Sequence, residues 1–135
     1  MPNPDPASER IKILFVEDEP TIIELITILL QRHQYEVIHV GEGDLVLAKV
    51  KEVRPDLIIL DIMIPKLDGF EVCRQIKSDE GLKKIPIIIL SALVQKGEIE
   101  MGIRMGADLY MTKPFQNANL LGNIEKLLKE GGLMP

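Results

Sequence analysis

The chain has 135 residues, about the length of one ordinary domain, so it needs no metal or disulfide to fold. Hydrophobic residues make up 46% of it and charged residues 27%, which is typical of a globular protein. The formal net charge of −5 argues against nucleic-acid binding and against docking on an anionic membrane. One cysteine, Cys73, excludes an internal disulfide, and the composition fits a cytoplasmic protein without a membrane segment.

Short apolar runs alternate with helical patterns along the chain. In chain order, the apolar runs predict strands at 11–16, 35–40, 57–60, 85–90 and 109–112. Helical spacing predicts a first helix with Pro20 in its first turn, followed by helices at 45–53, 69–77, 95–105 and 119–129. We expect residues 1–9 to be a disordered lead-in, 10–130 to form one domain, and 131–135 to be a tail or a truncated linker.

Five β–α units in succession specify a fold class. Because the strands lack alternating polar residues, we expect both faces of the sheet to be covered, with helical crossovers that make the strands parallel. Right-handed crossovers then predict an α/β fold with a doubly wound, five-stranded parallel sheet and helices on both faces. The expected arrangement is flavodoxin-like, with strand order 2-1-3-4-5.

Polar residues stand at the ends of four of the five predicted strands. Glu17 and Asp18 follow the first strand, Asp61 the third, Ser91 the fourth and Lys113 the fifth. In sheets of this kind, ligands bind beyond the carboxyl ends of the strands. We therefore expect these side chains to share one crevice.

Three carboxylates in one crevice repel one another, and cations relieve that repulsion. Carboxylate, carbonyl and water oxygens suit Mg²⁺, and Lys113 supplies a second positive charge. Such a set resembles a phosphoryl-transfer site, in which a carboxylate is the nucleophile and a metal, a lysine and a hydroxyl neutralise the phosphoryl oxygens.

Four segments carry a family resemblance: ILFVEDEP, LIILDIMIPKLDGFEVCRQIK, PIIILSAL and GADLYMTKPF. In this order and at these strand ends, they resemble a bacterial two-component response regulator receiver domain over about residues 10–130. The resemblance implies a signalling switch that is not an enzyme beyond its own phosphorylation and dephosphorylation. It implies that Asp61 accepts a phosphoryl group from a sensor histidine kinase or phosphotransfer protein. A downstream effector, which the sequence does not identify, would be reached through the fourth helix, fifth strand and fifth helix.

The same resemblance assigns roles to individual residues. The ligands it implies for Mg²⁺ are Glu17, Asp18, Asp61 and the backbone carbonyl of Met63. Ser91 and Lys113 would contact the phosphoryl oxygens, and Tyr110 would act with Ser91 as a switch by changing rotamer. The Lys113–Pro114 peptide bond would be cis.

Structural explanations compete with these roles. Each carboxylate could instead cap a helix, where acids favour the dipole, and Tyr110 could be a packed strand aromatic. His33 and His39 fall outside the strand-end set, so we expect them at the surface or the sheet edge. We interpret Cys73 as an inert buried thiol.

Three competing functions are open. A metal-dependent phosphohydrolase usually has a second acid two residues after the nucleophile, where Met63 stands here. A flavin-binding electron carrier needs a phosphate-binding loop after the first strand, where Glu17, Asp18 and Glu19 would repel a phosphate. A docking receiver without phosphotransfer does not need the complete set of phosphorylation residues present here.

The fourth predicted helix and its face bear on the response. Gly97, Gly102 and Gly106 indicate either a helix that shifts between two arrangements or a packing need for small residues. DNA-binding relatives pair through this face with charged residues. Here Asp108 is kept, but Leu109 stands where a second acid is usual, and the last helix lacks arginines. We expect any dimer through this face to be weak or to use different contacts.

Overall fold

The computed structural model describes residues 10–64 and 66–135, so the expectation for residues 1–9 lies outside the described residues. Seven strands are present among them: β1 (Lys12–Val16), β2 (Glu36–Val40), β3 (Leu57–Leu60), β4 (Met63–Ile64), β5 (Leu67–Asp68), β6 (Ile87–Ser91) and β7 (Leu109–Thr112). The helices are α1 (Pro20–Arg32), α2 (Val46–Val53), α3 (Gly69–Ser78), α4 (Lys96–Arg104) and α5 (Asn117–Glu130), and a 3₁₀ turn, η2 (Gly43–Leu45), precedes α2.

The main sheet has the order β2-β1-β3-β6-β7, and all its pairs are parallel. Since β6 and β7 are the fourth and fifth predicted strands, the predicted order 2-1-3-4-5 is confirmed. The short antiparallel pair β4–β5, in the connection between β3 and α3, was not predicted. The sheet thus has the expected doubly wound form with one added hairpin.

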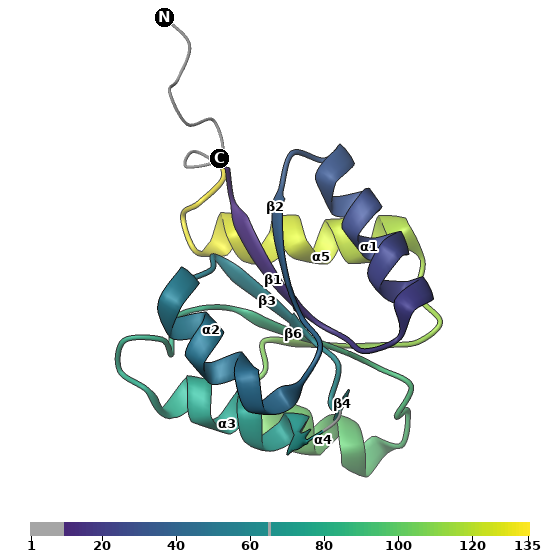
Figure 1. Cartoon of the computed structure of the whole chain (residues 1–135), viewed down its shortest axis with the longest axis vertical. Helices are drawn as coiled ribbons and strands as arrows, with labels where there is room; N and C mark the ends of the chain where they lie inside the picture. The colour runs from purple at the N-terminus through teal and green to yellow at the C-terminus, as the bar shows by residue number, and fades with distance from the viewer. Residues whose placement is uncertain (1–9, 65) are drawn as a thin grey trace, which may run out of the picture.

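Helices cover both faces of the sheet (Figure 1), with α1 and α5 on one face and α2, α3 and α4 on the other. The central strands β3 and β6 are buried along their whole length, as their unbroken apolar runs require. Their side chains alternate between two cores. Ile59 and Ile88 pack toward α1 and α5, whereas Ile58 and Ile89 pack toward α2 and α3.

Local signals set most helix boundaries. Pro20 begins α1 at a position where its missing N–H has no helical partner. Asp68 caps α3 by accepting a hydrogen bond from the Phe70 N–H, at 2.8 Å. Gly131 caps α5 at its carboxyl end.

Several predicted boundaries need correction by one or two residues. The fourth predicted strand, 85–90, begins at Ile87 because Pro86 has no N–H for the ladder. The last helix begins at Asn117 rather than 119. In residues 131–135, expected to be a tail or a truncated linker, Met134 packs against the core that α1 and α5 cover, and the Leu133 N–H donates to the Leu128 carbonyl. Among the described helices, none is long and apolar enough to cross a membrane.

Candidate functional site

Four strands of the main sheet end at one edge, which we call the carboxyl edge. Glu17 follows β1 directly, Asp61 follows β3, Ser91 ends β6, and Lys113 follows β7. Backbone hydrogen bonds hold these ends together: the Asp61 N–H donates to the Val16 carbonyl at 3.0 Å, and the Lys113 N–H to the Ser91 carbonyl at 2.8 Å. The parallel topology therefore brings the predicted strand-end residues to one place.

Glu17, Asp61 and Ser91 are buried, with exposed fractions of 1%, 5% and 0%. They are the buried polar side chains of residues 10–64 and 66–135, and all three lie at the carboxyl edge. Burying polar groups is costly unless each finds a hydrogen-bonding partner. Among the described residues, no buried side-chain nitrogen or oxygen lacks a partner.

Lys113 is the cation of this edge. Its Nζ lies 2.7 Å from Glu17 Oε1 and 3.1 Å from Asp61 Oδ2, so one ammonium group bridges two carboxylates. Burial lowers the pKa of Lys113, but the two carboxylates outweigh it and hold that pKa above its ordinary value. The lysine is therefore charged at neutral pH.

Glu17 is fixed by its own loop as well as by the lysine. Its Oε2 accepts hydrogen bonds from the N–H groups of Asp18, at 3.3 Å, and Glu19, at 3.2 Å. Burial raises the pKa of the Glu17 carboxyl, and the nearby Asp61 charge adds to that rise, while the hydrogen bond from Lys113 opposes it. Negative charge here is thus only partly compensated by Lys113.

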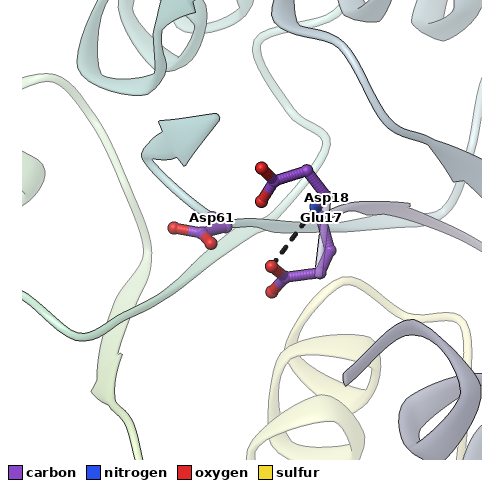
Figure 2. A group of neighbouring side chains, drawn as sticks. All are labelled: Glu17, Asp18 and Asp61. Atoms are coloured by element: carbon purple, nitrogen blue, oxygen red, sulfur yellow. Dashed lines mark hydrogen bonds between the residues drawn. The ribbon is translucent and has the colours of Figure 1, made fainter. Parts of the chain in front are cut away.

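Glu17, Asp18 and Asp61 form one cluster in which an oxygen of each lies within 4.8 Å of the others. Figure 2 shows the three side chains arising side by side from the ends of β1 and β3. Asp18 is exposed, so a hydrated ion could reach it from solvent. A set of carboxylate oxygens with access to water fits Mg²⁺, which keeps several of its waters when bound.

Asp61 is buried and, like Glu17, faces the lysine. Its Oδ1 accepts a hydrogen bond from the Met63 N–H at 2.9 Å, and its Oδ2 faces Lys113. This bond to a residue two positions later aims the carboxylate, whereas the next helix, α3, is capped by Asp68. The helix-cap explanation of Asp61 is therefore wrong.

Ser91 and Tyr110 are joined through one intervening residue, Leu93. The Leu93 N–H donates to Ser91 Oγ at 3.1 Å, and the Tyr110 hydroxyl donates to the Leu93 carbonyl at 2.7 Å. Tyr110 also lies against Gly102 of α4. The two predicted switch residues are thus connected to each other and to α4, and the Lys113–Pro114 peptide bond beside them is cis.

Sequence reasoning missed one contact at this edge. His39, on β2, places its Nε2 2.8 Å from the backbone carbonyl oxygen of Glu17. The signal was available, because β2 is the parallel neighbour of β1 in the predicted order and His39 stands just before its end. The other predictions for such residues agree with the structure: His33 is exposed, and Cys73 is a buried thiol whose pKa burial raises to about 11.

Comparisons with known proteins agree with this geometry. The response regulator receiver domain family matches residues 13–125. One relative is the alkaline phosphatase synthesis transcriptional regulatory protein PhoP of Bacillus subtilis. It is 40% identical over 87% of this chain and 48% of its own length. The DNA-binding response regulator MtrA of Mycolicibacterium smegmatis is 36% identical over 89% of this chain and 51% of its own. The chain thus spans about half the length of these curated relatives.

A solved structure resembles the whole domain. It is the receiver domain of the sensor histidine kinase PA1611 of Pseudomonas aeruginosa, described with a magnesium ion coordinated in its active site cleft. Its TM-score is 0.82 at 31% identity, covering 89% of this chain and 98% of that one. Because the family matches most of its length, and because it has a parallel sheet of the expected order with an acidic carboxyl edge, this chain belongs to the response regulator receiver domains.

Proposed function

We propose that Asp61 accepts a phosphoryl group from a sensor histidine kinase or a phosphotransfer protein, and that this modification switches the domain. One observation carries the proposal. Asp61 is a buried carboxylate with Lys113 Nζ 3.1 Å from one oxygen, in the same cluster as Glu17 and Asp18. That is the arrangement which a carboxylate nucleophile needs for attack on a negatively charged phosphoryl group.

Mg²⁺ is the ion that this site would hold, through Glu17, Asp18, Asp61 and the backbone carbonyl of Met63. The three clustered carboxylates support this assignment, as does the magnesium described in the similar PA1611 receiver. When bound, Mg²⁺ neutralises charge on the phosphoryl oxygens. Asp18, exposed at the rim, would meet the hydrated ion first.

The chain's own groups do the rest. An oxygen of Asp61 attacks phosphorus, the phosphorus–nitrogen bond to the donor histidine breaks, and a phosphorus–oxygen bond to Asp61 forms. Lys113 is held between Asp61 and Glu17, so its charge lies where an oxygen of the new group would be. Ser91 Oγ accepts from Leu93, which leaves its own hydrogen free to donate to a phosphoryl oxygen.

The response would run from Ser91 through Leu93 to Tyr110 and onto the face formed by α4, β7 and α5. A Ser91 hydroxyl drawn toward the phosphoryl group would move Leu93, whose carbonyl holds the Tyr110 hydroxyl. We propose that this face contacts a downstream effector in the cytoplasm. MtrA is named a DNA-binding response regulator and PhoP a transcriptional regulatory protein, but this acidic domain itself would not contact nucleic acid.

Phosphorylation of Asp61 is tested with a small phosphodonor and Mg²⁺. We expect the wild type to gain one phosphoryl group that resists acid but is released by hydroxylamine. The Asp61→Asn variant should gain none, because an amide is not a nucleophile of this kind. An equal label on Asp61→Asn would overturn the assignment, and circular dichroism of that variant checks that it is folded.

A further inference from the structure

We propose that His39 is a positioning residue of the cation site: it holds the Glu17–Asp18 peptide in the orientation that presents Asp18. The proposal rests on the function above, because the site it serves is the proposed Mg²⁺ site. His39 belongs to β2, the strand at one edge of the sheet that contributes no carboxylate to the cluster. It nevertheless reaches the backbone of Glu17 at 2.8 Å.

The chemistry of this contact has one direction. A carbonyl oxygen can only accept a hydrogen bond, so His39 Nε2 must carry the hydrogen and donate it. The ring is steadied by Phe15, its register partner on β1, through an edge-to-face contact with the centroids 6.3 Å apart. His39 is exposed, so the ring contributes little to the core and is available for this purpose.

The bond matters because of which peptide it holds. The Glu17–Asp18 peptide is planar, so fixing its oxygen and its nitrogen fixes the direction in which the chain leaves Glu17. Its oxygen accepts from His39 at 2.8 Å, and its N–H donates to Glu17 Oε2 at 3.3 Å. The remaining backbone group of Glu17, its N–H, donates to the Val40 carbonyl at 3.2 Å.

Asp18 depends on this peptide. Its carboxylate is exposed, and the hydrogen bonds that hold this turn are made by the backbone and by the Glu17 side chain. Glu17 has Lys113 and two N–H groups to hold its carboxylate, so it does not need His39. Without His39, the peptide would rotate among several orientations, and only a fraction would present Asp18 to the ion. Apparent affinity falls in proportion to that fraction.

Two amide substitutions of His39 test whether the hydrogen bond to the Glu17 carbonyl, rather than a polar side chain as such, supports Mg²⁺ binding. Glutamine places its side-chain N–H₂ at about the reach of a histidine Nε2, whereas asparagine carries the same group one methylene shorter. His39→Gln should bind Mg²⁺ like the wild type in titration calorimetry. His39→Asn should bind about fivefold more weakly, the equivalent of one ordinary hydrogen bond. His33→Asn, an exposed histidine at the end of α1, is the matched control and should bind like the wild type.

A second measurement does not use the ion. In the metal-free protein, hydrogen exchange of the Asp18 N–H should be faster in His39→Asn than in wild type and His39→Gln. Circular dichroism without metal should show that all of them are folded, and only His39→Asn should unfold at a slightly lower temperature, because it lacks this hydrogen bond. Equal Mg²⁺ binding and equal exchange in His39→Asn and the wild type would overturn the proposal, as would equal weakening by Gln and Asn. A wild type that binds no Mg²⁺ would instead refute the proposed function, and this inference with it.

Discussion

The carboxyl edge and helix α4 lie next to each other but are held in different ways. At the edge, Lys113 bridges two carboxylates and Glu17 receives further hydrogen bonds from its own loop. Helix α4, by contrast, buries only Gly102, whereas α5 buries four residues: Leu120, Ile124, Leu127 and Leu128. The contrast shows that the side chains of the carboxyl edge are already held in place, whereas the adjoining helix α4 is loosely packed. A loosely packed helix is free to shift when the carboxyl edge changes.

The glycines of this region have separate explanations. Gly102 lies against the Tyr110 ring, so a small residue is needed there for packing. Gly106, just after α4, has a φ of 106°, a conformation that favours glycine. Gly97 has nothing within 4 Å of where a methyl group would be, so neither packing nor backbone requires glycine. The packing interpretation therefore holds at Gly102, and Gly97 is the position left to lower helix propensity.

The carboxylate of Asp108 is already paired within its own chain. Its Oδ2 accepts from Lys77 Nζ and from the Ile87 N–H, both at 2.8 Å. Relatives that pair through this face use charged residues between copies, and Asp108 is less available for such a bond. This supports the prediction that any dimer through α4, β7 and α5 is weak or uses different contacts.

Removing the divalent ion tests the pre-organised carboxyl edge, and we expect it to have the largest effect, on phosphoryl labelling of Asp61. Labelling of Asp61 by a small phosphodonor should be lost in excess chelator and restored by added Mg²⁺. Asp18→Asn should need more Mg²⁺, because few protein groups are available to hold the ion. Glu24→Gln, on the exposed side of α1, is a charge-matched control. Equal labelling rates with and without chelator would contradict a role for the ion.

The sequence predicted what strong patterns specify. Unbroken apolar runs identify the five main strands, and the residues at the strand ends identify Glu17, Asp18, Asp61 and Lys113 as neighbours. The β4–β5 pair was missed because two-residue strands have no periodicity to detect. His39 was set aside as an edge residue because its partner is a backbone carbonyl, which leaves no trace in side-chain chemistry. The pairing of Asp108 with Lys77 joins residues 31 apart and depends on tertiary structure.

Two glycine substitutions test the loosely packed helix α4. We expect intermediate effects on the free energy of unfolding, with opposite signs. A methyl group at Gly102 would lie 2.8 Å from Tyr110 Cδ2 and 2.9 Å from Ile89 Cδ1, so a neighbour must move. Overpacking costs about 1–3 kcal/mol, so Gly102→Ala should lower the free energy of unfolding measured in urea. Gly97→Ala, in open space, should raise it by up to about 1 kcal/mol through helix propensity. If both substitutions stabilise the protein, α4 does not rest on Tyr110 as described.

The smallest expected effect concerns the boundary between the two regions, where Met63 and Leu93 stand two residues after Asp61 and Ser91. The resemblance to receiver domains implies that these positions flank the approach of the water that hydrolyses the phosphoaspartate. Neither side chain can orient a water by hydrogen bonding, so we expect slow hydrolysis. Met63 is 57% exposed, and Met63→Asn should therefore shorten the phosphoryl lifetime a few-fold without disturbing the fold.

Leu93 is partly buried and its backbone joins Ser91 to Tyr110, so Leu93→Glu changes both regions at once. The double variant should lose its phosphoryl group faster than Met63→Asn alone, measured as decay of the hydroxylamine-labile label. Met63→Leu keeps the size of the side chain and adds no hydrogen-bonding group, so its lifetime should match the wild type. If the double variant keeps its phosphoryl group as long as the wild type does, access of water at this boundary does not limit the signal. The duration would then be set by the groups of the carboxyl edge alone.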